Sequence, residues 1–194
     1  PAQDQIQPLI DLYYTGQMNK VEQACQAFLK TYPKALPVIN LLGAALQAQG
    51  KLQEAIARYD QVIQLKPDLA DAYYNRGNAL KELGQLAEAI ASYDQALKLK
   101  PDYAKAYYNR GNAFQELGQL AEAIASYEQA IELKPDYIEA WGNVFFTAKA
   151  LDQNAVKNSW LASYKKRNVG TAVLNSIDFK ILEYRLNAFT PHAV

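Results

Sequence analysis

Residues 70–103 read ADAYYNRGNALKELGQLAEAIASYDQALKLKPDY, and residues 104–137 read AKAYYNRGNAFQELGQLAEAIASYEQAIELKPDY. The two blocks differ at six positions, which are 71/105, 80/114, 81/115, 94/128, 97/131 and 98/132. The same interval of 34 residues separates four prolines along the chain: Pro33, Pro67, Pro101 and Pro135. A fixed period of this length indicates one supersecondary unit stacked on copies of itself.

Each block predicts two antiparallel helices. In the first helix, residues four and three apart share one face: Tyr73, Gly77 and Leu80. Gly84 stands where this helix should end, since glycine readily adopts the left-handed closing conformation. The second helix has apolar residues at steps of three and four: Leu86, Ala89, Ile90, Tyr93, Ala96 and Leu97. Pro101 stops it, and Asp102 is expected to cap the next helix.

Small residues mark the crossing of the two helices. We expect Gly77 and Ala89 to lie where the helices approach most closely, with Tyr73 and Tyr93 filling the wider gaps. One hairpin buries too little apolar surface to be stable alone, so neighbouring hairpins must stack.

This pattern resembles the tetratricopeptide repeat, whose signature positions fall here on Tyr73, Arg76, Gly77, Leu80, Ala89, Tyr93, Ala96 and Pro101. The blocks before and after, about 36–69 and 104–137, match in the same phase. Arg76 and Arg110 depart from the usual leucine, and we expect their stems to pack while their heads reach water.

The resemblance implies an all-α fold, an α-solenoid of antiparallel helix hairpins with a C-terminal helical cap. Three well-matched repeats occupy about 36–137, and degenerate copies at each end extend the array to 1–152. Residues 153–194 leave the period, with helices expected near 154–168 and 172–189. The second of these is unusually apolar. It could cap the stack, dock on another copy of the chain, or lead into a further domain.

Composition argues against several functions. The 194 residues carry 20 basic and 20 acidic side chains, so no basic excess favours nucleic acid or an anionic membrane surface. No apolar run is long enough to span a membrane. The single Cys25 and the lack of a secretory signal in PAQDQIQPLI favour the cytoplasm, although the chain could be trimmed from a longer protein.

The sequence predicts no catalytic centre, metal site or cofactor. The one histidine, His192, has no partner at ligand spacing, and Cys25 occupies a core position of its repeat. The acidic side chains alternate with lysine and glutamine, as on solvated helix faces.

The resemblance also implies a binding surface, because first helices of successive tetratricopeptide repeats line a concave groove. The implied peptide-binding residues are Tyr74, Asn75, Asn78, Lys81, Lys105, Tyr108, Asn109, Asn112, Gln115 and Asn143, accompanied by Asp71, Glu82, Glu116, Glu139 and Lys149.

Asn75, Asn109 and Asn143 recur at the repeat interval. An asparagine amide offers both a donor and an acceptor, so a column of them suits an extended peptide backbone. A similar ladder lines arrays of the O-linked N-acetylglucosamine transferase type, whose NLGN-like segments resemble the NRGNA segments here. The alternative is that these asparagines only bridge neighbouring helices or are solvated.

A clamp for C-terminal carboxylates is disfavoured. The five slots of the chaperone-type clamp hold Asn40, Ala44, Asn75, Lys105 and Asn109, of which only Asn75 and Lys105 match. Two missing cations would leave a bound carboxylate underpaired.

The leading hypothesis is therefore a non-catalytic scaffold or adaptor that holds an extended, roughly neutral peptide. A second hypothesis is self-assembly through the C-terminal helix or the repeat edges. A third is the substrate-recruiting front end of a larger enzyme, such as a glycosyl- or sulfotransferase.

Overall fold

The computed structural model describes residues 3–150, and this part of the chain contains nine α-helices and no strands. The first eight helices form four hairpins: α1 (Gln3–Tyr14) with α2 (Met18–Thr31), α3 (Leu36–Ala48) with α4 (Leu52–Leu65), α5 (Ala70–Glu82) with α6 (Leu86–Leu99), and α7 (Ala104–Glu116) with α8 (Leu120–Leu133). Helix α9 (Ile138–Ala150) begins a fifth unit. The helices expected near 154–168 and 172–189 lie outside the described residues.

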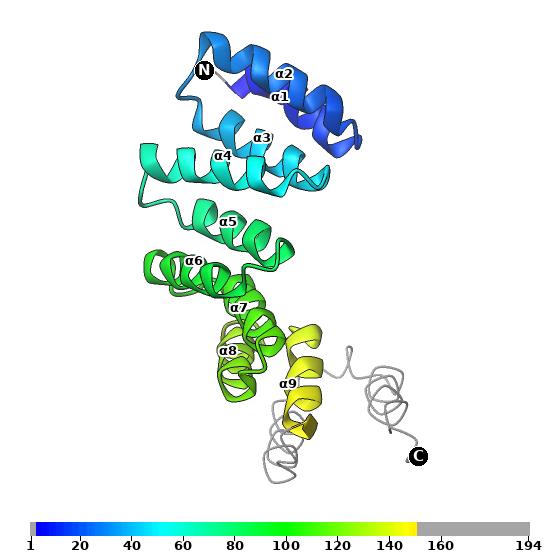
Figure 1. The fold of residues 1–194 in the computed structure, drawn as a ribbon, viewed down its shortest axis with the longest axis vertical. Helices are drawn as coiled ribbons and strands as arrows, with labels where there is room; N and C mark the ends of the chain where they lie inside the picture. Colours follow the sequence, from blue (N-terminus) through cyan, green and yellow to red (C-terminus); the bar gives the residue numbers. More distant parts are fainter. Residues whose placement is uncertain (1–2, 151–194) are drawn as a thin grey trace.

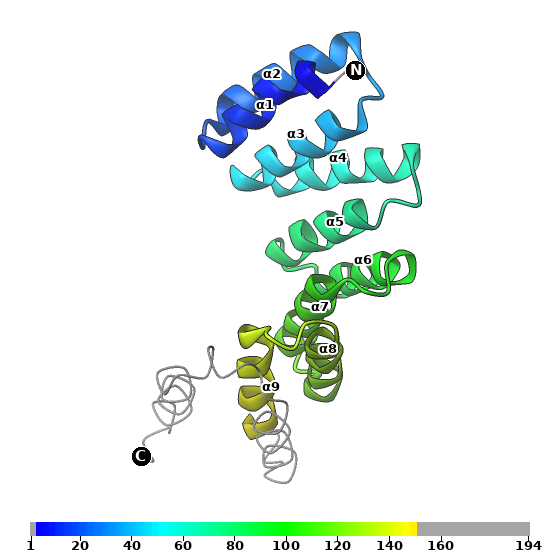
Figure 2. The same cartoon turned by 180° about the vertical axis from the view of Figure 1, so that it is seen from behind.

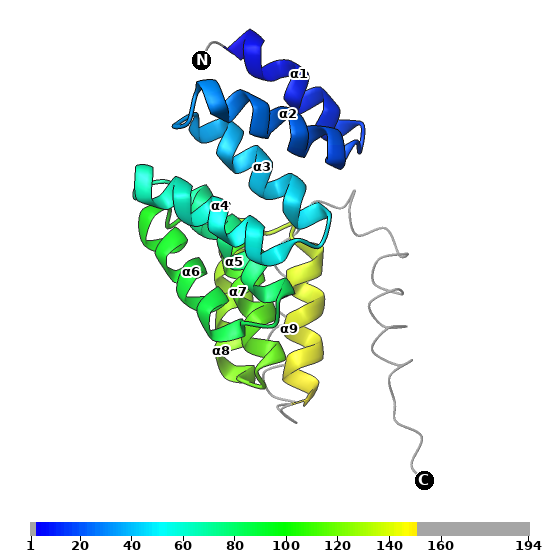
Figure 3. The ribbon, with the colours of Figure 1, turned by 45° about the horizontal axis from the view of Figure 1, so that its top comes forward.

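The hairpins stack in chain order along the long axis of the molecule (Figures 1 and 2). Each second helix packs between its own first helix and the first helix of the next unit, as α6 does between α5 and α7. The helix axes turn along the stack, so that α4 runs across the view of Figure 1 while α9 runs along it. Helix α9 lies beside α8, which it contacts, at the end of the stack in Figures 1 and 2, and Figure 3 shows the same helices with the top of the molecule turned forward. The predicted all-α solenoid is confirmed.

Glycine closes each first helix as predicted. Helix α5 ends at Glu82, and Gly84 follows with φ 81°. The N–H of Gln85 then donates to the main-chain oxygen of Leu80 at 2.9 Å, which satisfies one of the last helical carbonyls. The equivalent turns have positive-φ glycines at Gly16, Gly50 and Gly118.

The predicted cap was wrong. Tyr103, not Asp102, stands at the N-cap of α7, and it makes no side-chain cap hydrogen bond. The main-chain oxygen of Asp102 instead accepts from the N–H of Ala104 at 3.1 Å. Asp102 therefore lies one residue before the cap position, and it takes part in the turn after Pro101 through its main-chain oxygen.

A glycine–tyrosine contact sets the distance between the two helices of a hairpin. A Cβ added to Gly77 would lie 2.6 Å from Cε1 of Tyr93, and Tyr93 is fully buried. The same contact recurs between Gly43 and Tyr59 and between Gly111 and Tyr127. Gly77 thus marks a close approach as predicted, but the expectation that Tyr93 fills a wider gap was wrong, because its ring lies directly on Gly77.

The two arginines in the leucine slot bridge three helices rather than simply reaching water. Arg76 on α5 places Nε 2.7 Å from Oδ1 of Asp60 on α4, and its Nη1 donates to Oγ of the buried Ser92 on α6 at 2.8 Å. Arg110 repeats the arrangement with Asp94 at 2.7 Å and Ser126 at 3.2 Å. The side chains are partly exposed, so each pair contributes modestly to stability but fixes the register between units.

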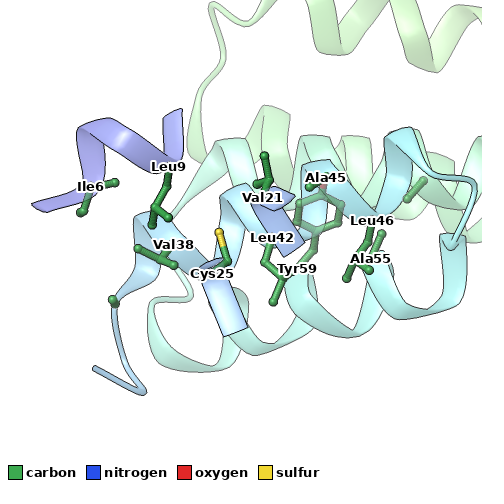
Figure 4. Close-up of a cluster of buried hydrophobic side chains, with 12 residues drawn as sticks. Ile6, Leu9, Val21, Cys25, Val38, Leu42, Ala45, Leu46, Ala55 and Tyr59 are labelled. Carbon is green, nitrogen blue, oxygen red and sulfur yellow. The ribbon is translucent and has the colours of Figure 1, made fainter. Parts of the chain in front are cut away.

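The N-terminal core is apolar. Residues from α1 to α4 meet in one cluster, in which Cys25 lies among Leu9, Val21, Val38 and Leu42 (Figure 4). Cys25 is fully buried, as its position in the repeat predicted, and burial raises the pKa of its thiol to about 11.

We expect Cys25 to react with 5,5′-dithiobis(2-nitrobenzoate) at pH 8 only after unfolding, because the thiolate is the nucleophile and the native thiol is buried and protonated. A free thiol has a pKa of about 8.5, so the unfolded chain loses this proton first as pH rises. Burial of Cys25 therefore lowers the free energy of unfolding progressively between about pH 8.5 and 11, and leaves it unchanged below that range. Stoichiometric labelling without denaturant, faster than global unfolding, would contradict this.

Candidate functional site

The ten predicted binding residues all lie on first helices, namely α5, α7 and α9. Helix α3 contacts α5, and α5 contacts α7, so these helices form one continuous surface along the stack. We call it the first-helix surface. All ten side chains are half-buried except Lys105, which is exposed. The structure therefore brings the predicted residues together on one face.

The asparagines form hydrogen bonds between neighbouring units. Nδ2 of Asn109 on α7 donates to Oδ1 of Asn78 at 2.9 Å and to Oη of Tyr74 at 3.1 Å, both on α5. Nδ2 of Asn143 on α9 repeats this with Asn112 at 2.9 Å and Tyr108 at 3.4 Å on α7. Both N–H donors of Asn109 are thereby used within the protein. The N–H donors of Asn109 and Asn143 therefore bridge neighbouring helices, which was the alternative to peptide binding.

Asn75 differs from the other two. Its Nδ2 donates to Oδ1 of Asn40 on α3 at 3.1 Å. The second acceptor is missing, because Ala44 occupies the slot that Asn78 and Asn112 fill in the later units. One N–H of Asn75 has no partner among the described residues.

Buried tyrosines orient the second row of asparagines. The hydroxyl of Tyr93 donates to Oδ1 of Asn78 at 2.9 Å, and that of Tyr127 donates to Oδ1 of Asn112 at 2.9 Å. Burial raises the pKa of Tyr93 far above its ordinary value, and nearby Tyr74 and glutamate side chains add to the shift, so the hydroxyl stays protonated and keeps donating. Gln115 joins the second of these networks, since its Oε1 lies 2.8 Å from the Tyr127 hydroxyl and shares its single proton with Oδ1 of Asn112.

These bonds leave a regular set of groups without a partner in the described part of the chain. The acceptors are the Oδ1 atoms of Asn75, Asn109 and Asn143, and the donors are the Nδ2 groups of Asn78 and Asn112. Asn78 with Asn109, and Asn112 with Asn143, form hydrogen-bonded pairs with Nδ2–Oδ1 distances of 2.9 Å. In each pair the first asparagine keeps its Nδ2 donors and the second keeps its Oδ1 acceptor. Such a pair can hydrogen-bond the C=O and N–H of a bound peptide.

Two tyrosines give this surface fixed aromatic groups. The rings of Tyr74 and Tyr103 pack with centroids 4.8 Å apart, and those of Tyr108 and Tyr137 at 4.9 Å. Lys100 covers the ring of Tyr103 at 4.7 Å. The rings of Tyr74 and Tyr108 are therefore held in place, and each hydroxyl can still donate to a ligand.

Charged side chains lie at the ends of the first helices. Lys81 on α5 places Nζ 3.6 Å from Oε1 of Glu116 on α7, and Glu82 accepts a hydrogen bond from Nε2 of Gln47 on α3. Both glutamates are exposed, and their charges add to the upward shift of the Tyr93 pKa, so they lie near that buried hydroxyl. The carboxylates of Glu82 and Glu116 thus lie at the C-terminal ends of α5 and α7, beyond the asparagines of the same helices.

Sequence reasoning missed the N-terminal part of the same surface. Counting back by 34 residues, Leu41 takes the slot of Asn75, while Ile10 and Ala44 take the slot of Asn78. Ile10 and Leu41 are half-buried and pack against the N-terminal core. The 34-residue interval could have identified these residues, because it assigns equivalent positions in every unit.

The described residues include no group of three or more side chains suited to a metal ion. His192 lies outside them. Across residues 3–150, no helix is both long and apolar enough to cross a membrane.

Tetratricopeptide families match the middle of the chain. A family described as TPR repeat matches residues 43–84 and 77–118, and one described as tetratricopeptide repeat matches residues 104–137. No curated protein sequence matches this chain.

Solved structures share the fold. The first TPR of Spaghetti (RPAP3), solved bound to the HSP90 peptide SRMEEVD, is 32% identical with a TM-score of 0.59, and the match covers 60% of this chain and 93% of that one. MamA (41–end) from Desulfovibrio magneticus RS-1 is 20% identical with a TM-score of 0.74, covering 86% of this chain and 96% of that one. YrrB, described as a TPR protein with an unusual peptide-binding site, is 18% identical with a TM-score of 0.68 and 84% coverage of each chain.

Proposed function

We propose that this chain, whose residues 43–137 match tetratricopeptide-repeat families, is a non-catalytic scaffold that holds an extended peptide along the first-helix surface. The observation that carries the proposal is the alternation of unpaired amide donors and acceptors along α5, α7 and α9. An extended peptide presents an N–H and a C=O at every residue, and these need partners when they leave water.

The asparagine ladder acts here in pairs rather than singly. Asn109 has used both donors, so its Oδ1 accepts from a peptide N–H while the Nδ2 of Asn78 donates to the peptide C=O. Asn75 keeps one N–H and its Oδ1, and can therefore bind both groups of one peptide unit alone. The proposed site thus holds the main chain at three places, one for each asparagine of the column.

Two of the similar structures support a peptide ligand, since one was solved with the HSP90 peptide and the other is described by its peptide-binding site. We place the protein in the cytoplasm on the strength of its single cysteine. Self-association through residues 153–194, or a role as the front end of a larger enzyme with ladders of the O-linked N-acetylglucosamine transferase type, stays an alternative.

The proposal is tested by selecting peptides from a random library of extended ten-residue sequences on the immobilised protein and measuring their affinities for variants. We expect Asn75→Ala to weaken binding by about tenfold, since it loses two hydrogen bonds to the peptide, each about 0.5–1.5 kcal/mol. Its melting temperature should change little, because Asn75 makes a single bond within the protein.

Asn109→Ala should weaken binding and also lower the melting temperature, because it removes the bonds to both Asn78 and Tyr74. Gln95→Ala, on the exposed side of α6, is the matched control and should change neither quantity. Selected peptides that bind Asn75→Ala and wild type equally would contradict the proposal, as would a library that yields no binder.

A further inference from the structure

We infer that the first-helix surface has two chemically different halves, and that its partner is an extended segment with a bulky apolar side chain for the α1–α3 half and a basic side chain for the α5–α7 half. This inference rests on the proposed function and specifies the class of peptide that the site takes.

Three of the four slots in the α1–α3 half that carry asparagine elsewhere are apolar, and the fourth holds Gln7, whose Nε2 donates to Asp11. Ile10, Leu41 and Ala44 stand where later units have Asn75, Asn78 and their equivalents, and all three are only half-buried. At the end of α1, the side chain of Tyr14 is 83% exposed. Partly exposed apolar side chains on a binding face favour an apolar ligand group, because its burial removes further apolar surface from water.

Tyr13 belongs to the same half. It is half-buried against the N-terminal core, and its proximity adds to the upward shift of the pKa of Tyr59, which burial mainly causes. The hydroxyl of Tyr59 donates to Oε1 of Gln47 at 3.1 Å. Tyr13 therefore lies on the same side of the hairpin as the first-helix slots, and it extends the apolar area across α1 and α3.

The α5–α7 half and the adjacent α9 carry an excess of negative charge. Their first-helix slots supply four carboxylates: Asp71, Glu82, Glu116 and Glu139. They supply two ammonium groups from described side chains, Lys81 and Lys105, and Lys149 adds one more from the sequence. Lys81 pairs with Glu116, whereas Glu82 has only the neutral Gln47 as a partner. A cation on the ligand complements this half, and an acidic ligand is repelled.

Asn75 lies at the border of the two halves. On one side its Nδ2 donates to Asn40 of α3, the helix in which Ala44 takes the slot of Asn78, and on the other side the asparagine pairs begin at Asn78. A peptide unit bound to both groups of Asn75 would therefore direct one flanking part of the ligand over Leu41 and Ala44 and the other toward Glu82. This fixes the order of the two ligand side chains along the surface.

The test uses fluorescein-labelled, N-acetylated and C-amidated peptides of nine residues on a Ser/Thr/Gln background. Leu and Lys stand four residues apart in the peptides. Residues an even number apart lie on the same side of an extended chain. Four residues span about 13 Å, which exceeds the distance between the axes of two packed helices. The nine-residue set contains Leu before Lys, Lys before Leu, each alone and neither, and the seven-residue acidic peptide SRMEEVD is measured beside it. Affinities are measured by fluorescence anisotropy at low and high salt.

We expect one of the two orders to bind best. Replacing its Leu by Ser should cost about tenfold, in line with the burial of one apolar side chain. Replacing its Lys by Ser should cost only about threefold, and this part should vanish at high salt, as for an exposed ion pair. SRMEEVD should bind more weakly than the neutral peptide.

Two variants assign these preferences to the two halves. Glu82→Gln should abolish the preference for Lys and leave that for Leu. Ala44→Asn should abolish the preference for Leu, since it places a polar side chain in an apolar slot and leaves the core side chains intact. Its acceptor also takes the free N–H of Asn75, so all peptides lose affinity together, and the ratio between the Leu and Ser peptides reports the apolar half.

Equal affinity for both orders, or tighter binding of the acidic or all-polar peptide, would overturn the inference. If such peptides still lose affinity with Asn75→Ala, the proposed function stands and only the division into halves fails. If no peptide of the set binds and the random library also yields none, both fail.

Discussion

Replacing Gly77 with leucine is expected to lower the free energy of unfolding by about 3 kcal/mol, near the upper end of what overpacking costs. The Cβ atom alone would lie 2.6 Å from Cε1 and 2.8 Å from Cδ1 of Tyr93. Tyr93 cannot move aside, because it is fully buried and its hydroxyl is bonded to Asn78. The helices α5 and α6 must therefore separate, which also disturbs the surface that carries Asn78.

Gly142→Ala is the matched control for this prediction. Gly142 lies within α9, and a Cβ added there meets no atom within 4 Å. Alanine favours the helix by up to about 1 kcal/mol over glycine, so this variant should be as stable as wild type or more so. Urea denaturation gives both values. A Gly77→Leu protein with unchanged stability would mean that α5 and α6 do not approach at this point.

Replacing Trp141 with alanine is expected to cost about 3–5 kcal/mol, the usual range for losing a large aromatic side chain from a core. Trp141 is 1% exposed, its ring stacks on Phe145 with centroids 6.4 Å apart, and its Nε1 donates to the main-chain oxygen of Pro135 at 2.9 Å. It fixes α9 against α8, and α9 carries Asn143.

Trp141→Phe separates the two contributions. It retains most of the buried ring and loses the bond to Pro135, so it should cost about 1–2 kcal/mol, mostly from the main-chain oxygen left unpaired. Thermal unfolding monitored by circular dichroism distinguishes the three proteins. An alanine variant that melts with wild type would show that α9 is not packed on α8 in this way.

Much of the fold could be predicted because the sequence repeats. Gly84 and its equivalents end the first helices, the prolines end the second helices, and the apolar spacing selects the buried faces. The errors concern side chains whose partners lie in a neighbouring unit. Arg76 was expected to reach water, since its ion pair with Asp60 joins two units and no spacing within one unit reveals it.

The candidate surface could be predicted in place but not in detail. The repeat pattern puts the ten residues on one face, and the structure agrees. Asn109 uses both of its N–H donors within the protein, whereas Asn75 uses only one. This difference depends on whether the preceding unit has asparagine or alanine at one position. The sequence contains this difference, as Ala44 against Asn78, but its consequence follows only once α3 and α5 are placed side by side.

In the proposed function, side-chain amides of the first helices hold an extended peptide main chain. The most direct test is to follow the side-chain amide NMR signals of the ¹⁵N-labelled protein while a library-selected peptide is added. We expect shifts at the NH₂ groups of Asn75, Asn78 and Asn112, with those of Gln95 and Gln129 on the second helices unchanged. Binding that shifts the second-helix signals and leaves the asparagines unmoved would contradict it.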